Sequence, residues 1–356
     1  MCTYFEIGRV LNSFFVCLNI SQTKDRFLNS VSCYKIRKGH KRKNQNIIQA
    51  MLFKEILDQQ INSKQYLINK IQAPPIAGIS IVISNNRIQQ IVNGEQVHSG
   101  RRKQYVALIE KTLLKYKVKN SLLNINLADE PIDGHFNFCR KIGNSRQFLL
   151  PNHRFTNDDI IFSTETYDDI VKLIRNSRQD PYESRKSQFY TNCIPHKSKV
   201  DYFAFAVKNP AICTGFIYSN SSHKTLSLTK EFIRDLELQN LIGDLPALFE
   251  EHLKYKYVIY NDGNTLSDRM RLLLLTDSVI VRKSSPYEEF YSYLLKPDQN
   301  YIQYNNVEEL PEIHKRLEAD IPLCNSIRKN NQQFVDTYLK YDNILEYVAN
   351  LINGVC

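Results

Sequence analysis

The chain has 356 residues, of which 42% are hydrophobic and 11% aromatic, and it carries a formal net charge of +10. This length suits two domains of ordinary size, and the hydrophobic content can bury two cores, which excludes a wholly disordered chain. No apolar run approaches the ~20 residues of a transmembrane helix. We therefore expect a folded cytoplasmic protein, with peripheral contact to a membrane left open.

The positive charge is concentrated in the first 60 residues, which hold ten Lys or Arg against four acids and contribute +6. Its densest part runs from Lys35 to Lys43. Such a run is either a solvated extension or a segment that docks on an anionic membrane or on nucleic acid. Residues 1–60 are therefore predicted as a basic N-terminal extension, with helical apolar spacing over 46–61.

An α/β pattern begins at residue 78. In chain order, the spacing of apolar and turn residues predicts a strand at 78–84, a hairpin at 87–98 turned by Asn93-Gly94, a helix at 101–117, a strand at 121–131 and a helix at 167–176. The region 134–200 gives little else, and we expect the chain to cross between two domains there.

The second half alternates more regularly. Its predicted strands are 200–207, 255–261, 278–283 and 301–304, and its predicted helices are 225–238, 265–276, 286–295, 308–319 and 327–339. Strands that alternate with helices of this length indicate right-handed crossovers and a parallel sheet. In such sheets ligands bind beyond the carboxyl ends of the strands.

Several common chemistries are excluded. No two of the eight cysteines have zinc-knuckle spacing, so we expect reduced, mostly buried thiols. The chain has no D-x-D triplet, nucleophile elbow, P-loop or G-x-G-x-x-G run. We therefore expect no metal and no cofactor.

The most informative segment follows the predicted strand at 255–261. It runs into Asp262-Gly263-Asn264 and a helix predicted from Thr265, with Arg269 in its first turns. Free amides at a helix N-terminus attract anions, glycine lets a phosphate approach the backbone, and a guanidinium holds two phosphate oxygens. The pattern fits both a diphosphate site and an ordinary strand-to-helix turn.

A longer set of residues occurs here in one order with fixed spacing. It consists of Tyr255-Lys256-Tyr257, Asp262-Gly263, Ser267-x-Arg269, Ser285-Pro286, Glu288, Phe290-Tyr291, Leu295-x-Pro297 and Tyr301-Ile302. This order resembles glycosyltransferase family 90, the lipopolysaccharide-modifying, capsule-associated and protein O-glucosyltransferase group. The resemblance extends over about residues 78–350.

The resemblance implies an α/β, GT-B-like fold with two Rossmann-like domains and a cleft between them. We expect an N-terminal acceptor domain at 61–190, a nucleotide-sugar-binding domain at 191–335, and a C-terminal helix at 336–356 that packs back on the N-terminal domain. The implied reaction is an inverting, metal-independent transfer from a UDP-sugar to a hydroxyl of a glycan, such as lipopolysaccharide or capsule.

The resemblance also implies the site residues. Asp129 matches the acid of the family's N-x-x-D-x-P element and would be the general base. The alternative is that Asp129 and Glu130 are only solvent-exposed acids of a loop after a strand. Glu130 is the nearest rival for the role of base. Arg269 and Ser267 would hold the diphosphate. The full set expected to bind the donor is Gly263, Asn264, Thr265, Leu266, Ser267, Arg269, Lys208 and Ser285.

One departure affects this assignment. Many members carry Arg-Gly-Ser after a Phe on the strand near 203, whereas the segment from Phe203 to Pro210 contains no arginine. Lys208 is expected to supply the charge, without the fork of a guanidinium. A degenerate protein that binds sugar nucleotides without turnover is one alternative. A nucleic-acid-associated protein is another, which the scarcity of aromatics beside the basic run disfavours.

Overall fold

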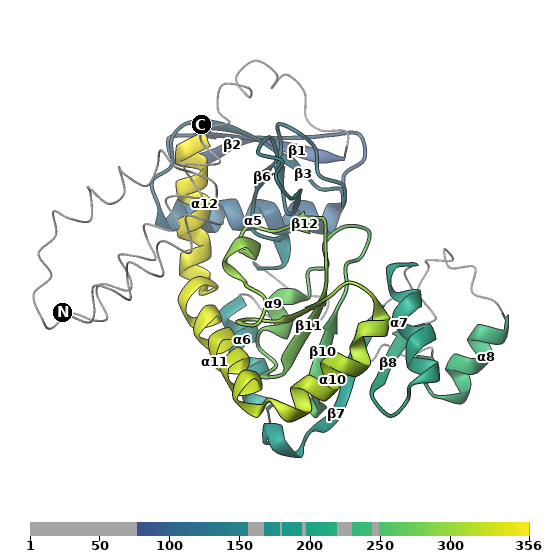
Figure 1. Cartoon of the computed structure of the whole chain (residues 1–356). Helices are drawn as coiled ribbons and strands as arrows, with labels where there is room; N and C mark the ends of the chain where they lie inside the picture. Colours follow the sequence, from purple (N-terminus) through teal and green to yellow (C-terminus); the bar gives the residue numbers. More distant parts are fainter. Residues whose placement is uncertain are drawn as a thin grey trace, which may run out of the picture. The chain divides into compact units, whose positions relative to one another are not determined.

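The computed structural model describes residues 77–155, 167–178, 180–193, 197–218, 230–243 and 249–355. All of these residues belong to one compact unit, Glu55–Cys356, whose helices and strands are labelled in Figure 1. Most of the predicted extension 1–60 belongs to the other unit, and all of it, with the predicted helix 46–61, lies outside the described residues.

The first sheet is mixed rather than parallel. Its order is β2-β1-β3-β4-β6, in which β1 is antiparallel to β2 and β3 while β3, β4 and β6 run parallel. The strands are β1 (Gly78–Ser84), β2 (Arg87–Asn93), β3 (Ser121–Asn126), β4 (Phe136–Asn137) and β6 (Phe148–Leu149). The helix α5 (Ser99–Lys115) buries Tyr105, Leu108 and Ile109, which confirms the helix predicted at 101–117.

The hairpin of this sheet turns at a different place from the predicted one. Asn85-Asn86, with φ angles of 52° and 57°, joins β1 to β2. A two-residue hairpin turn of this type needs positive φ at both positions, which asparagine tolerates. The side chain of Asn86 also donates to the carbonyl of Leu113 at 2.6 Å. Asn93-Gly94, the predicted turn, instead lies where β2 ends.

The second sheet is entirely parallel. Its order is β13-β11-β10-β7-β8-β9. The strands are β7 (Lys186–Cys193), β8 (Cys213–Tyr218), β9 (Ile242–Gly243), β10 (Tyr255–Tyr260), β11 (Val279–Lys283) and β13 (Ile302–Tyr304). Numbered along the chain, this is the 3-2-1-4-5-6 order of a Rossmann fold, with its switch point between β7 and β10.

The helices complete both halves. They are α6 (Tyr167–Asn176), α7 (Lys197–Lys208), α8 (Lys230–Leu238), α9 (Met270–Leu273), α10 (Leu310–Ala319), α11 (Ile321–Tyr338) and α12 (Tyr341–Val355). After α11 the chain returns to the first half, where α12 packs on α5 (Figure 1). There Lys119 donates to the carbonyl of Asn353 at 2.8 Å.

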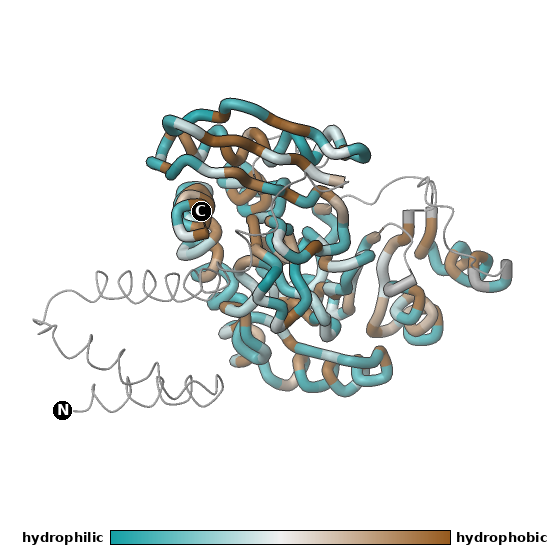
Figure 2. The backbone as a smooth tube through the Cα atoms, turned by 90° about the horizontal axis from the view of Figure 1, so that it is seen from above, coloured by the Kyte–Doolittle hydropathy of each residue, from teal (hydrophilic) through white to brown (hydrophobic). Residues whose placement is uncertain are grey.

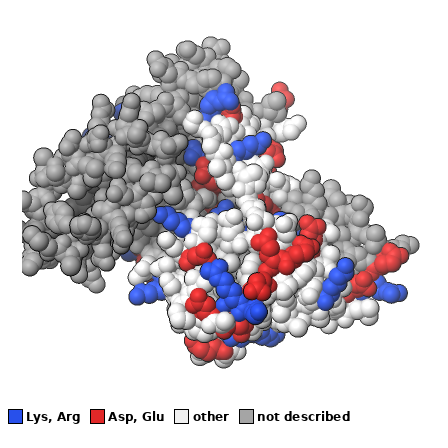
Figure 3. Space-filling model, in the orientation of Figure 1, with Lys and Arg blue, Asp and Glu red and all other residues white. Residues whose placement is uncertain are grey.

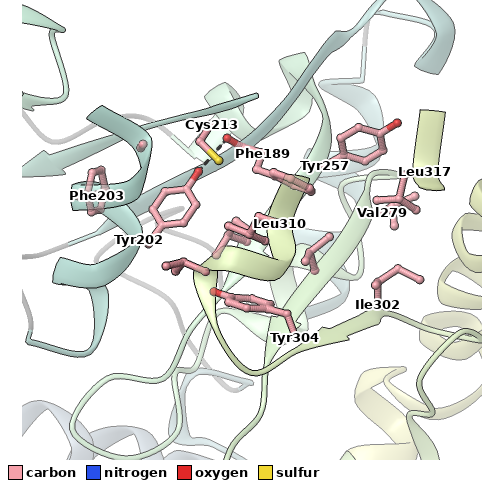
Figure 4. Close-up of a cluster of buried hydrophobic side chains, with 14 of the residues drawn as sticks. Phe189, Tyr202, Phe203, Cys213, Tyr257, Val279, Ile302, Tyr304, Leu310 and Leu317 are labelled. Carbon is pink, nitrogen blue, oxygen red and sulfur yellow. Dashed lines mark hydrogen bonds between the residues drawn. The ribbon is translucent and has the colours of Figure 1, made fainter. Parts of the chain in front are cut away.

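Residues 200–207 form part of α7, so the strand predicted there is wrong. Tyr202, Phe203 and Ala206 are buried at helical spacing in the core of the second half, together with Phe189 and Tyr257 of the strands (Figure 4). The hydroxyl of Tyr202 donates to the carbonyl of Phe189 at 2.8 Å. The aromatic residues that favour a strand locally therefore serve as one face of a helix.

Two other predicted helices differ from the structure. Residues 286–295 hold β12 (Tyr287–Glu288) and a 3-10 turn at Ser292–Leu294 instead of a helix, because β12 pairs antiparallel with β5 (Arg140–Lys141) of the first half. The helix predicted at 265–276 shrinks to α9, with an irregular loop before it.

The α/β, GT-B-like class is confirmed as two sheet-bearing halves, with the correction that the first sheet is partly antiparallel. β7 crosses the predicted boundary between residues 190 and 191. Hydrophobic and hydrophilic stretches alternate along the described chain (Figure 2). Acidic and basic side chains are interspersed on the face shown in Figure 3, so neither sign dominates the described surface seen there.

Candidate functional site

The switch point between β7 and β10 is the expected ligand site of the second sheet. In a doubly wound sheet, the crossovers on the two sides of this point run to opposite faces and leave a crevice at the carboxyl ends of the strands. Those ends are Cys193 on β7 and Tyr260 on β10. The loop 261–269 follows β10 directly and therefore lies at this edge.

Hydrogen bonds and burial fix the shape of that loop. The hydroxyl of Tyr260 donates to the carbonyl of Ser267 at 2.7 Å. The side chain of Leu266 is buried against Phe138 and Cys139 of the first half. Gly263 lies at the surface, where an added Cβ would meet no atom within 4 Å. The loop is thus anchored at both ends, since Asn261 is buried, and open around Gly263 and Asn264.

Asp129, placed just after β3, meets this loop across 135 residues of sequence. Its Oδ2 accepts a 3.0 Å hydrogen bond from the amide of Asn264. The hydroxyl of Thr265 donates to the Asp129 carbonyl at 3.1 Å. The structure therefore brings the predicted base and the predicted donor loop into direct contact.

Arg101 on α5 holds the other oxygen of the same carboxylate. Its guanidinium donates to Asp129 Oδ1 at 2.7 Å and to the carbonyl of Leu127 at 2.7 Å. Burial opposes ionisation of Asp129, but the hydrogen bond from Asn264 and the charge of Arg101 outweigh it and lower its pKa. Asp129 is therefore held as a carboxylate in a fixed orientation.

Arg269 reaches from the end of the loop to β7. Its Nη1 donates to the carbonyl of Asn192 and its Nε to the Ser267 hydroxyl at 3.3 Å. Its Nη2 is buried with no hydrogen-bond partner, and Arg269 forms no ion pair with a described residue. One donor of this guanidinium thus remains available to a ligand.

Lys199, in the first turn of α7, is a second cation beside Arg269. It is 8% exposed and, within the described ranges, takes part in no ion pair. Burial and the charge of Arg269 lower its pKa to about 8. The acids around the two cations have other partners, since Asp268 pairs with Arg154 at 2.8 Å and Asp262 bonds to Ser285. Two neighbouring cations that form no ion pair with a described acid indicate an anion site.

The helix N-terminus at this site belongs to α7 and not to the predicted helix at Thr265. α9 begins only at Met270 and has four residues, too few to present a helix dipole to an anion. α7 has twelve residues and begins just beyond the carboxyl end of β7. Its dipole therefore favours negative charge where Lys199 lies.

The structure does not bring Lys208 to this edge. Lys208 is the exposed last residue of α7, and a crossover helix runs back toward the amino ends of the strands. The structure therefore does not support its assignment to the donor site, which depended on reading 200–207 as a strand. The strand that precedes α7 is β7, whose last residues Thr191-Asn192-Cys193 also lack an arginine.

Sequence reasoning missed Arg101 and Lys199, although both carry a signal. Arg101 lies four residues before the buried Tyr105 on the apolar face of α5. Lys199 precedes Tyr202 and Phe203 by three and four residues on the buried face of α7. A basic residue within the apolar face of a helix points to a buried partner or ligand.

No group of three His, Cys, Asp or Glu side chains in the described ranges has a metal-binding arrangement. Cys139, Cys213 and Cys324 are free buried thiols. The described helices also include none that is both long and apolar enough to cross a membrane.

One protein-family model matches most of the chain. The model of "Glycosyl transferase family 90" matches residues 85–355. Protein O-glucosyltransferase 1 of Rattus norvegicus is 26% identical over 186 residues, which cover 51% of this chain and 44% of that protein. Protein O-glucosyltransferase 3 of Mus musculus is 22% identical over 224 residues, 58% of this chain and 41% of that protein.

The chain thus spans less than half the length of these two relatives. Among solved structures, HepE of Anabaena in complex with UDP-glucose aligns with a TM-score of 0.36 and 14% identity, covering 52% of each chain.

Proposed function

Because this chain belongs to glycosyl transferase family 90, we propose that it transfers a sugar from a UDP-sugar to an acceptor hydroxyl, with inversion and without a metal ion. The observation that carries the proposal is the contact between Asp129 and the loop after β10, with Asn264 at 3.0 Å from the carboxylate. A base for the acceptor and a binding loop for the donor are thereby adjacent.

The donor diphosphate would lie between Arg269 and Lys199. Departure of UDP concentrates negative charge on the β-phosphate, and preorganised cations stabilise such charge as it develops. Metal-dependent enzymes use a divalent ion for this purpose, whereas here the two side chains and the N-terminus of α7 supply the positive charge. Ser285, bonded to Asp262, places a hydroxyl at the same edge.

Asp129 would accept the proton of the attacking hydroxyl. In a single displacement the acceptor oxygen bonds to the anomeric carbon, the bond to UDP breaks, and the hydroxyl proton passes to one carboxylate. Arg101 keeps Asp129 ionised for this step. Since Asn264 occupies Oδ2, the acceptor hydroxyl would take the second lone pair of that oxygen or replace the amide.

The names of the relatives concern protein acceptors, whereas the family resemblance implies a glycan such as lipopolysaccharide or capsule. Both offer a hydroxyl nucleophile, so the reaction class is the same. We also propose that the protein is cytoplasmic and that its basic N-terminal segment contacts an anionic membrane.

The proposal is tested by incubating the full chain with UDP-glucose, UDP-galactose and UDP-N-acetylglucosamine and measuring UDP release with and without acceptor sugars. We expect release from at least one donor, faster when acceptor is present. Tight UDP binding without release from any donor would instead identify the degenerate, binding-only alternative. Absence of both binding and release would contradict a donor site at β7 and β10.

A further inference from the structure

A cavity of about 360 Å³ lies at the carboxyl ends of β11 and β13, two strands away from β7. Its walls come mainly from the second half, with Ile142 added by the first half. The volume falls within the ~300–1,000 Å³ of small-molecule sites. Of the residues expected to bind the donor, Ser285 alone lines this cavity.

One wall of the cavity contacts the segment that carries Asp129. Tyr287 lines the cavity and packs on the cluster of Leu266, Phe138 and Cys139. The hydroxyl of Tyr287 also interacts with the Glu130 carboxylate, and burial together with that charge raises the pKa of Tyr287. The residue before Glu130 is the proposed base. Tyr287 therefore connects the cavity to the segment that carries Asp129 and Glu130.

The two halves build this wall together. β12 pairs with β5, and Glu288 on β12 accepts from Arg140 on β5 at 2.7 Å, with both side chains 16% exposed. The amide of Ile142 also donates to the carbonyl of Pro286 at 2.9 Å. The wall on the side of the first half is thus held by backbone pairing and by a largely buried ion pair.

The lining has the chemistry of a carbohydrate site. Flat aromatic faces pack on the C–H faces of a sugar, and side-chain hydroxyls and amides exchange hydrogen bonds with its hydroxyl groups. The cavity offers tyrosine rings, hydroxyls and an amide, from Tyr287, Tyr293, Tyr301, Ser284, Ser292 and Gln303. Few purely apolar side chains line it, which argues against a hydrophobic ligand.

Arg282 adds a buried cation to this lining. It is 8% exposed, and its guanidinium lies 5.7 Å from the ring centre of Tyr260 and 5.2 Å from that of Tyr301. Of the described acids, none forms an ion pair with it. A guanidinium fixed between two rings presents its remaining N–H groups in a defined plane, which suits neighbouring sugar hydroxyls.

We infer that this cavity is a subsite for a sugar ring of the acceptor, so that the acceptor of this chain is a glycan and not a bare polypeptide side chain. The inference rests on the proposed function. It gives the two binding regions separate tasks: the edge at β7 and β10 holds the nucleotide, and the edge at β11 and β13 holds the acceptor next to the base.

Gln303→Trp tests the subsite by filling it, because Gln303 is an exposed residue of β13 that lines the cavity. Gln299→Trp is the matched control, since Gln299 is exposed close by and does not line the cavity. Binding is read by saturation-transfer NMR with the methyl pyranosides of glucose, galactose, mannose, N-acetylglucosamine and glucuronic acid. UDP affinity is measured in parallel by calorimetry.

We expect saturation transfer to at least one sugar in the parent chain and in Gln299→Trp, and its loss in Gln303→Trp. The UDP dissociation constant should stay within twofold in all three proteins. No transfer to any of the five sugars, equal transfer in Gln303→Trp, or displacement of the sugar by uridine would overturn the inference. Sugar binding without UDP release from any donor would leave the subsite intact and contradict the proposed function instead.

Discussion

Replacing Arg269 by alanine removes the guanidinium that spans the switch point. In the free protein its Nη1 and Nε are already engaged with the carbonyl of Asn192 and the hydroxyl of Ser267, so Nη2 is the donor left for a ligand. One hydrogen bond to a charged group contributes ~1.5–3 kcal/mol. The UDP dissociation constant should therefore rise by about 10- to 150-fold.

Calorimetry measures the change in the UDP dissociation constant directly. The thermal unfolding temperature of each variant shows whether it remains folded. Arg269→Lys retains the charge without the fork and should fall between the parent and alanine. Arg234→Ala, on the exposed face of α8, is the control for loss of an arginine. A folded Arg269→Ala variant that binds UDP as tightly as the parent would refute the diphosphate assignment.

Three further predictions concern the same site. Arg101→Gln removes the cation that lowers the pKa of Asp129, so the acid limb of the pH profile of kcat/KM should move to higher pH. The control Arg102→Gln removes the guanidinium that bonds Asn93 and should leave the acid limb in place. An unmoved acid limb in Arg101→Gln would count against the role of Arg101. UDP affinity should weaken as pH rises through about 8, because Lys199 loses its proton there. Lys199→Arg should abolish this pH dependence when the UDP dissociation constant is measured over a series of pH values. The same pH dependence in both proteins would exclude Lys199 from the diphosphate site. Turnover should persist in excess EDTA, and a loss restored by manganese would show that a metal is required.

Regular elements with a clear apolar period were predictable from the sequence. The helices at 101–117 and 167–176 and the strands at 255–261 and 278–283 needed only local patterns, because each buries one face or both faces in a core. The prediction of a helix at 286–295 was wrong because β12 forms by pairing with β5, almost 150 residues earlier in the chain. No local pattern contains that partner.

The site divides in the same way. Asp129 and the loop from Gly263 to Arg269 carried motifs, so the sequence pointed to both. Arg101 and Lys199 belong to no motif. Each is only a basic residue within the apolar face of a helix, and tertiary packing decides that one meets Asp129 and the other Arg269. Reading 200–207 as a strand placed the expected cation at Lys208, the last residue of α7, whereas Lys199 lies in the first turn of that helix.

Turnover by Asp129→Asn tests the central claim that this carboxylate is the base beside the donor loop. Asparagine keeps the size of the side chain but cannot take the proton, so turnover should fall by ~10²–10⁴-fold while UDP affinity is retained. Asp133→Asn, which alters a carboxylate bonded to Asn144 and Gln147 in the same connection, should be much milder. Full activity in Asp129→Asn, or loss of transfer only in Glu130→Gln, would contradict the account.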